Sequence, residues 1–177
     1  MCHQREGTTL QFIDMSQEDT EYNKDTDASL IEAAAGGDET IVRRLLEKGA
    51  NIEATNGDGN TPLIEAAESG HEAVVRLLLK KGANIEAKGE GGNTPLIEAA
   101  YFGKKSVVSL LLEKGANIEA RDEDDNTPLI SAAMRGSAAV VRLLLEKGAN
   151  IEATNREGCT AYDCAKKTSI RQLLRSY

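Results

Sequence analysis

The sequence is poor in the side chains that fill a large globular core. It has no tryptophan, two phenylalanines and four tyrosines in 177 residues, although 40% of the residues are hydrophobic. Leucine, isoleucine, valine and alanine must therefore form the interior. Such a composition favours thin layers of helices over one large core.

Clustered basic residues are also absent. The chain has 21 lysines and arginines against 29 acidic residues, for a net charge of −8. Residues 1–27 hold two basic and seven acidic side chains, which leaves 19 basic and 22 acidic ones for the other 150. Because a polyanion or an anionic membrane surface requires clustered positive charge, the sequence argues against nucleic acid and membranes as ligands.

Two further absences bear on location. No apolar run reaches the roughly 18 residues that a membrane span needs, and the start lacks a basic segment followed by an apolar stretch. The three cysteines, Cys2, Cys159 and Cys164, are odd in number and have no framework spacing, which fits reduced thiols. We therefore expect a cytoplasmic location, with the nucleus as an alternative.

What the sequence does contain is a repeat of 33 residues. The string Thr-Pro-Leu-Ile-Glu-Ala-Ala occupies 61–67 and 94–100 and returns with one change at 127–133. A second string, Lys-Gly-Ala-Asn-Ile-Glu-Ala, starts at residues 48, 81, 114 and 147. Two independent markers keep one register without an insertion, so the chain is a repeat array.

Each repeat has the signals of two short helices and a turn. Thr61 is a good N-cap, Pro62 suits the first helical position, and Gly70 ends the first helix. A leucine- and valine-rich second helix stops at Gly82, and the glycine-rich segment 84–93 predicts a turn or hairpin. Helices this short do not persist alone in water, so neighbouring units must stabilise them by stacking.

These features resemble the ankyrin repeat over residues 28–177. The resemblance implies an all-α ankyrin-repeat solenoid of stacked helix-turn-helix units with β-turn or hairpin fingers. Ahead of it, residues 1–27 form an acidic tail for which we expect disorder. We expect five units, with the first and last atypical, at about 27–55, 56–88, 89–121, 122–154 and 155–177.

The sequence offers no set of residues for catalysis or metal binding. Glu32, Glu65 and Glu98 recur at one repeat position, but stacked layers lie roughly 10 Å apart, too far for two carboxylates to share an ion. We interpret them as a solvated or locally hydrogen-bonded row. His71 lacks a second histidine at zinc-protease spacing, and we expect it to cap its helix. We therefore predict no enzyme activity, no metal and no cofactor.

The repeats diverge at the pair that follows Ala-Ala in the first helix. The pair is Ala-Gly at 35–36, Glu-Ser at 68–69, Tyr-Phe at 101–102 and Met-Arg at 134–135. Packing does not demand aromatic residues there, since small ones suffice in the same column. In ankyrin repeats these positions and the finger tips line the concave face that grips partner proteins, so the resemblance implies a binding site.

Carried over residue by residue, the predicted partner-binding positions are Asp58, Asn60, Glu90, Asn93, Tyr101, Phe102, Glu123, Asp124, Asn126, Met134, Arg135, Arg156 and Glu157. Tyr101, Phe102 and Met134 would form a central anchor, and the mainly acidic tips would favour a basic partner. A competing interpretation is that Phe102 folds onto its own stack or onto the N-terminal tail.

Our leading hypothesis is a monomeric, non-catalytic protein–protein interaction module that binds one protein through the concave surface of units two to five. A first alternative is a repeat-array fragment of a larger signalling or immune receptor-like scaffold, because the near-identical units resemble such arrays. A second, less favoured alternative is a thiol redox switch that uses Cys159 and Cys164, although their spacing is not that of a C-x-x-C pair.

Overall fold

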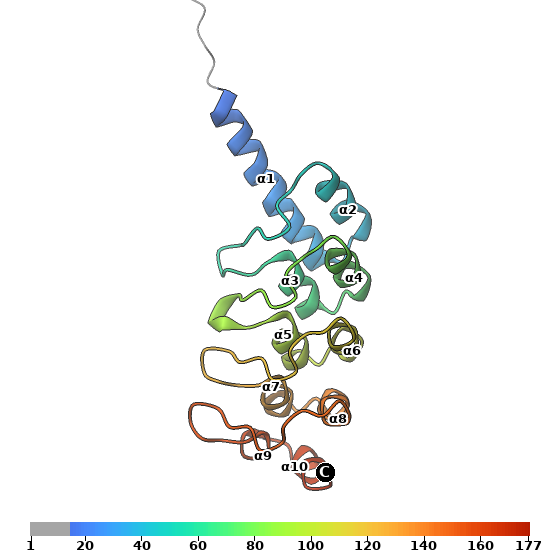
Figure 1. Cartoon of the computed structure of the whole chain (residues 1–177), viewed down its shortest axis with the longest axis vertical. Coiled ribbons are helices and arrows are strands. Elements are labelled where there is room, and N and C mark those ends of the chain that lie inside the picture. The colour runs from blue at the N-terminus through green and yellow to red at the C-terminus, as the bar shows by residue number, and fades with distance from the viewer. Residues whose placement is uncertain (1–14) are drawn as a thin grey trace, which may run out of the picture.

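The computed structural model describes residues 15–177, with side chains from residue 25 onward, as helix pairs stacked along one axis (Figure 1). The helices are α1 Met15–Gly36, α2 Glu39–Glu47, α3 Pro62–Ser69, α4 Glu72–Lys80, α5 Pro95–Tyr101, α6 Lys105–Glu113, α7 Pro128–Arg135, α8 Ala138–Glu146, α9 Ala161–Cys164 and α10 Thr168–Leu174, with a 3-10 turn, η1, at Glu90–Gly92.

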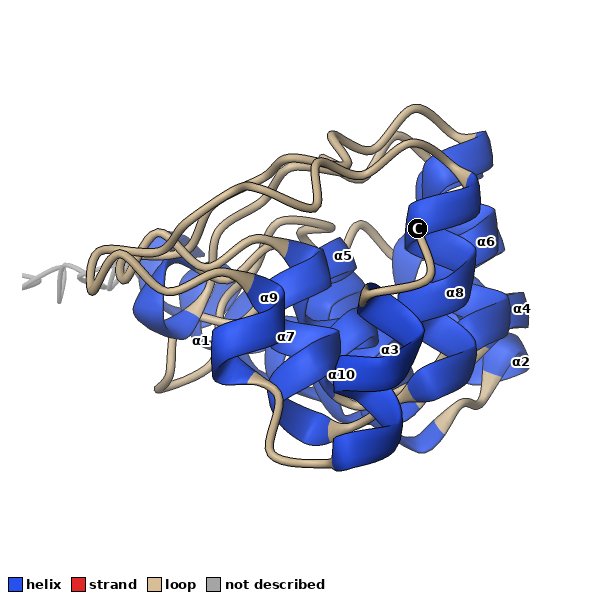
Figure 2. Cartoon of the chain, turned by 90° about the horizontal axis from the view of Figure 1, so that it is seen from below, coloured by secondary structure: helices blue, strands red, loops and turns tan. Residues whose placement is uncertain are grey.

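The helices form two layers. The inner layer of α1, α3, α5, α7 and α9 and the outer layer of α2, α4, α6, α8 and α10 each stack on their own neighbours in chain order. The finger loops project away from the helices on one side, as the view along the stack shows (Figure 2). Between residues 15 and 177 the only β-type pairing is an isolated bridge of Thr154 with Thr160, so the predicted all-α solenoid with turn-like fingers is confirmed.

The inner helices begin where the sequence predicts. The side chains of Thr61, Thr94 and Thr127 each accept a hydrogen bond from a backbone N–H three residues on, at 3.4, 3.3 and 3.3 Å, and a proline follows each threonine. This threonine satisfies one of the N–H groups that every helix leaves free at its start. In the last unit Thr160 and Asp163 form a capping box instead, and these hydrogen bonds lower the pKa of Asp163.

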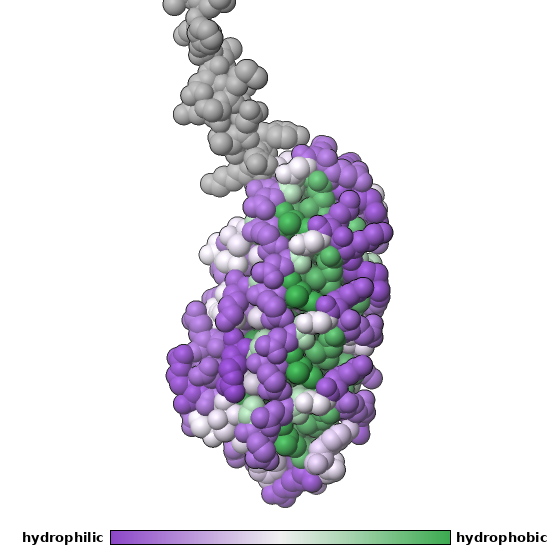
Figure 3. All heavy atoms as spheres, in the orientation of Figure 1, coloured by the Kyte–Doolittle hydropathy of each residue, from purple (hydrophilic) through white to green (hydrophobic). Residues whose placement is uncertain are grey.

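Equivalent apolar side chains from successive units form one continuous core. Leu78, Leu111 and Leu144 of the outer helices are fully buried, and the inner helices contribute buried Ala-Ala pairs that allow close approach. On the face shown in Figure 3, apolar patches recur along the long axis between hydrophilic borders. No single unit encloses such a core, so the units depend on one another.

The loop that follows each outer helix carries a second device that joins the units. The glutamate of its Ile-Glu-Ala string accepts, through Oε1, a hydrogen bond at 2.8 Å from the backbone N–H of a residue 31 positions on. The three pairs are Glu53 with Asn84, Glu86 with Asn117, and Glu119 with Asn150. Asp27 of α1 plays the same part for the N–H of Asn51, at 2.6 Å. We refer to these contacts as the loop staples.

Helix α1 begins within the segment that the sequence analysis assigns to an acidic tail. Residues 15–27 form the first part of α1, whereas residues 1–14 lie outside the described residues. No glycine or proline interrupts the chain between Met15 and Ala35. The C-terminal part of α1 is anchored, because Leu30 and Ala34 are fully buried and Asp27 is stapled to the next loop. The predicted boundary at residue 27 therefore falls inside a helix.

The prediction that His71 caps its helix is wrong. His71 occupies the N-cap position of α4, but its side chain makes no capping hydrogen bond. Its Nε2 lies 3.0 Å from the carbonyl oxygen of Ala35 in the preceding unit. A Cβ on Gly37 would come within 2.5 Å of the His71 ring, so the imidazole packs on a backbone that only glycine leaves open. The histidine thus joins two units rather than ending one helix.

No helix among the described residues combines the length and the apolar character that crossing a bilayer requires.

Candidate functional site

The inner helices and the fingers enclose a groove at the middle of the stack, with a volume of about 340 Å³. We call it the central groove. Its lining residues come from three consecutive units: Asn60, Glu68, Glu90, Asn93, Ile97, Glu98, Tyr101, Phe102, Asp122, Asn126, Ser131 and Met134. The structure therefore brings together seven of the predicted positions, namely Asn60, Glu90, Asn93, Tyr101, Phe102, Asn126 and Met134.

An aromatic pair forms one wall of the central groove. The rings of Tyr101 and Phe102 meet edge to face, with centroids 5.1 Å apart and an interplanar angle of 80°. The guanidinium carbon of Arg135 lies 4.6 Å from the Tyr101 centroid and 5.8 Å from that of Phe102. Phe102 nevertheless keeps 39% of its surface exposed. The pair is held by its neighbours and remains open to solvent, so Phe102 is not folded away into the stack.

Negatively charged side chains lie beside these rings in the central groove. Glu98 is buried, with 9% of its surface exposed, and lines the groove with Glu68. Burial raises the pKa of Glu98, and the neighbouring carboxylate of Glu68 raises it further, while a hydrogen bond from Asn93 acts in the other direction. Burial also raises the pKa of Glu68, aided by Glu65 and opposed by Lys104. Burial and neighbouring carboxylates thus both disfavour the charged forms of Glu98 and Glu68.

The equivalent carboxylate in unit two, Glu65, has two hydrogen-bond donors. Glu65 accepts hydrogen bonds from the side-chain amides of Asn56 and Asn60, at 2.9 and 3.0 Å. In unit four the same two finger positions are Asp122 and Asn126, and their side chains bond to each other at 2.9 Å. The helix position that corresponds to Glu65 is a serine there, so no second carboxylate faces the aspartate.

Unit three lacks one of these donors. Gly89 stands where Asn56 stands in unit two, so Glu98 retains Asn93 alone as an amide partner. Position 89 also has no room for a side chain in this conformation, because a Cβ on Gly89 would lie 2.1 Å from Oδ1 of Asn60. That oxygen instead accepts a hydrogen bond from the backbone N–H of Glu90, at 3.2 Å. The glycine is therefore the reason why Glu98 has one amide donor where Glu65 has two.

Asn60 itself is less available than a finger-tip position suggests. It is 8% exposed, and both ends of its amide are engaged, with Glu65 and with Glu90. Asn126 is similar: its amide nitrogen bonds to Asp122, and its oxygen accepts from Asn155 at 3.1 Å. These asparagines line the groove but mainly fix the fingers relative to one another.

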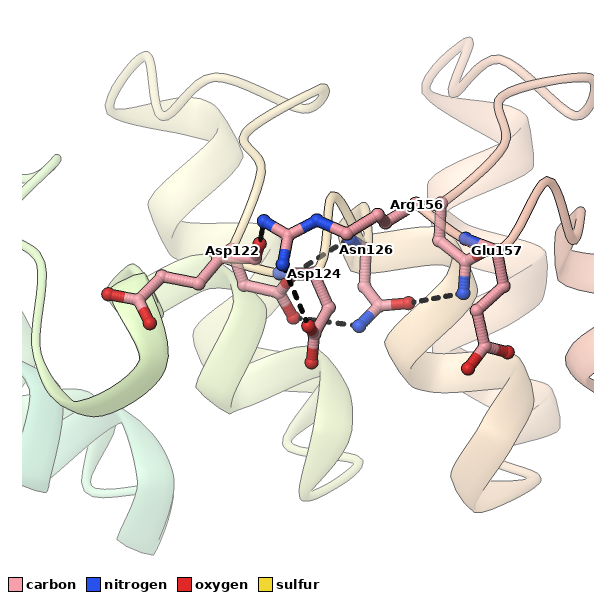
Figure 4. A network of polar contacts seen from close by, with 7 residues as sticks. Asp122, Asp124, Asn126, Arg156 and Glu157 are labelled. Atoms are coloured by element: carbon pink, nitrogen blue, oxygen red, sulfur yellow. Dashed lines mark hydrogen bonds and ion pairs between the residues drawn. The ribbon is translucent and has the colours of Figure 1, made fainter.

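The tips of fingers four and five are tied together (Figure 4). The backbone N–H of Arg156 donates to the carbonyl of Asp124 at 2.9 Å, and their side chains form an exposed ion pair at 3.6 Å. The Arg156 guanidinium also donates to the carbonyl of Glu123, whose own N–H bonds back to Gly91 at 2.8 Å. Neighbouring fingers thus support one another, which limits their freedom before any partner arrives.

Next to this network lies a second hollow of about 440 Å³, the C-terminal groove. It is lined by Asp124, Asn126, Met134, Asn155, Arg156, Glu157, Cys159, Asp163 and Cys164. It therefore gathers four of the five predicted positions of fingers four and five, namely Asp124, Asn126, Arg156 and Glu157. Asp58, Glu123 and Arg135 line neither groove.

The two cysteines of this hollow are free thiols. Burial raises the pKa of Cys164, and the adjacent Cys159 raises it further. Because the thiolate is the reactive form, a raised pKa makes the thiol less nucleophilic. The geometry therefore gives no support to the alternative of a redox switch.

Sequence reasoning missed several lining residues. It interpreted Glu98 as part of a solvated or locally hydrogen-bonded row and not as a binding residue, and it did not select Glu68, Ile97, Asp122 or Ser131. The signal for Glu98 was the finger column that runs Asn, Gly, Asp, Asn at positions 56, 89, 122 and 155, in which glycine alone has no side chain to offer. Among the described residues no group of three or more histidine, cysteine or acidic side chains is arranged to hold a metal ion.

Comparison with known protein families agrees with this architecture. A model described as ankyrin repeats, three copies, matches residues 5–89, 30–122, 87–155 and 120–175 in overlapping windows. A search of curated protein sequences finds no match.

Proposed function

Because the chain belongs to the ankyrin-repeat family, whose members are generally protein–protein interaction modules, we propose that it binds a partner protein as a non-catalytic monomer, through the concave surface of its fingers and inner helices. The observation that carries this proposal is the aromatic pair in the central groove, in which Tyr101 is half-buried and Phe102 is exposed. The corresponding positions in the first two units are Ala-Gly and Glu-Ser, so the fold does not need aromatic residues there.

The arrangement of the pair suits an interface anchor. Large aromatic side chains near the centre of an interface supply most of its binding energy when they become desolvated. Tyr101 and Met134 lie on the consecutive inner helices α5 and α7, Phe102 is the C-cap of α5, and all three line the central groove. Edge-to-face contact and the Arg135 cation fix the rings, so little side-chain entropy remains to be lost on binding.

The charge of the same surface favours a basic partner. Glu68, Glu90, Glu98 and Asp122 line the central groove, and none of its lining residues is lysine or arginine. Complementary charge steers association and disfavours wrong partners. We therefore extend the proposal to a partner that presents positive charge around an apolar contact.

Affinity capture with the double variant Tyr101→Ala/Phe102→Ala tests this proposal. The wild-type chain is used as bait in a lysate of the source cell, the captured protein is identified, and its affinity is measured with purified components. A matched control, Ile41→Ala/Tyr177→Ala, removes two exposed apolar side chains outside both grooves. We expect the first variant to lose the partner and the control to keep it. Equal capture by both variants would contradict the proposal.

A further inference from the structure

We propose that the central groove receives one arginine side chain of the partner, with the guanidinium between the carboxylates of Glu98 and Glu68 and the rings of Tyr101 and Phe102. This inference rests on the proposed function and names the residue that the groove recognises. It depends on the helix register, on the spare acceptor capacity of Glu98 and on the chemistry of the aromatic wall.

The register of α5 brings acid and aromatic groups together. Glu98 is three residues before Tyr101, the last residue of α5, and four before Phe102, its C-cap, so the three side chains emerge on one side of the helix end. Glu68 occupies in α3 the repeat position that Tyr101 occupies in α5, one layer away in the stack. All four side chains line the same hollow. A ligand group that enters between α3 and α5 therefore meets carboxylates and rings together.

Glu98 retains the capacity to accept further hydrogen bonds. An ionised carboxylate offers about four lone-pair sites. Glu65 uses part of this capacity on two asparagine amides, whereas Glu98 has only Asn93 because Gly89 supplies no side chain. Glu98 is nine-tenths buried, so water compensates it less well than it would a surface acid. This carboxylate can therefore accept further hydrogen bonds from a donor that enters the groove.

The aromatic wall already binds a guanidinium of the chain itself. Arg135 lies over both rings, within the roughly 6 Å at which cation–π attraction operates. Arg135 does not line the central groove, so it leaves the groove side of the wall available. The rings are therefore placed to interact with a second planar cation that enters from the groove.

These features favour arginine over lysine. A guanidinium is planar, donates two parallel hydrogen bonds to one carboxylate and stacks on aromatic rings, while an ammonium group is a compact point charge. The groove, at about 340 Å³, lies at the low end of the range for small-ligand sites, which suits a single side chain rather than a larger ligand.

Titration with three small probes tests the inference in the whole chain. The probes are the acetylated amides of arginine, lysine and citrulline, because citrulline keeps the shape of arginine without its charge. Backbone and side-chain NMR signals of Asn93, Glu98 and Tyr101 report on binding. We expect saturable shifts with the arginine probe, weaker ones with lysine and none with citrulline. Saturation by citrulline as well, or no saturable shift with arginine, would overturn the inference.

Two matched variants locate the site. Glu98→Gln removes the buried charge, and Glu32→Gln removes the same charge at the same repeat position in unit one, where the side chain is exposed. Loss of a charged hydrogen-bonded pair is expected to weaken arginine binding at least about tenfold in Glu98→Gln. Glu68→Gln should weaken it less, and Glu32→Gln should leave it unchanged. Retained binding in a folded Glu98→Gln protein would contradict the assignment.

The same variants separate this inference from the proposed function. If Glu98→Gln captures the partner as well as wild type while Tyr101→Ala/Phe102→Ala does not, the module binds its partner without an arginine in this groove. The inference would then be wrong and the proposed function would stand. If neither variant affects capture, both fail.

Discussion

Two regions of the stack differ in how much the repeats vary: one, the loop edge, is uniform from unit to unit, and the other, the finger edge, is divergent. At the loop edge, formed by the strings at 48–54, 81–87, 114–120 and 147–153, each unit repeats the same residues, and three staples share one geometry at 2.8 Å. At the finger edge, formed by the turns at 56–60, 89–93, 122–126 and 155–159 and the adjoining ends of the inner helices, each unit differs. Uniform residues hold neighbouring units in one register, and divergent residues create local chemistry.

The contrast extends to how polar groups are satisfied. Every staple glutamate between two units meets a backbone N–H, so this edge needs nothing from outside the chain. At the finger edge Glu98 has lost a donor and Phe102 remains exposed. Incomplete satisfaction costs stability in the free protein and is offset when a complementary partner binds.

The largest effect is expected in the shared core. Leu111→Ala removes a fully buried side chain that packs between units, and should lower the free energy of unfolding by about 3 kcal/mol. Phe102→Ala, at the divergent edge, should lower it by less than about 1 kcal/mol because the ring is partly exposed. Urea unfolding followed by circular dichroism measures both. Equal losses would show that the finger-edge aromatics are core residues after all.

The loop staples should give the next largest effect. Glu86→Ala removes the acceptor for the N–H of Asn117 and is expected to cost about 1–2 kcal/mol. Glu152→Ala is the internal control, since this exposed glutamate has the same sequence context but no Lys-Gly-Ala-Asn loop follows it in unit five. Its cost should be within about 0.5 kcal/mol of zero. A comparable loss in both variants would mean that the staple itself contributes little.

The close approach of Gly89 to Asn60 at the finger edge can be tested by substitution. Gly89→Ala brings a Cβ against Asn60 and should destabilise the protein by about 1 kcal/mol. Gly57→Ala is the matched control, because a Cβ there meets nothing within 4 Å. The control should be neutral or slightly stabilising, since alanine restricts the unfolded chain. Thermal unfolding of the two variants checks this, and an unchanged midpoint for Gly89→Ala would argue against the close approach.

The smallest effect depends on pH. Since the pKa of Glu98 is raised in the folded protein, the folded state binds its proton more tightly than the unfolded chain does. The contribution of Glu98 to the free energy of unfolding should therefore fall as pH rises from the ordinary pKa of 4.5 through the raised pKa of the folded state. Above that pKa the destabilisation is fully present.

Glu98→Gln should accordingly be more stable than wild type at neutral pH, and this advantage should shrink towards about pH 4. Urea unfolding at several pH values measures the difference, with Glu32→Gln as the control. A constant difference between Glu98→Gln and wild type at all pH values would contradict a raised pKa.

The sequence predicts the regular part of this molecule well. The 33-residue period, the Thr-Pro helix starts and the glycine stops depend on local chemistry that each unit contains within itself. The hydrogen bonds between units could not be predicted from local chemistry, because Glu53 and His71 have partners in other units, at sequence separations of 31 and 36. Their partners become evident only once the stacking geometry is known.

The site was predictable only in part, for a similar reason. Tyr101 and Phe102 depart visibly from their column, so comparison between units finds them. Glu98 matches its column and looks ordinary, yet its environment changes because Gly89, nine residues earlier, withholds a donor. A residue that is identical in several repeats can therefore have a different environment in one of them when a nearby residue differs. The polar residues 15–27 have no helical periodicity, so the sequence does not predict that α1 begins before the buried residues Leu30 and Ala34.

The affinity of the purified partner for wild type and for Tyr101→Ala/Phe102→Ala, measured by calorimetry alongside the unfolding midpoints, tests the central claim most directly. If the divergent finger edge recognises the partner and the uniform edge holds the stack, affinity should fall at least about tenfold while the midpoint hardly moves. Unchanged affinity, or a loss of affinity that only follows a loss of folded protein, would contradict the claim.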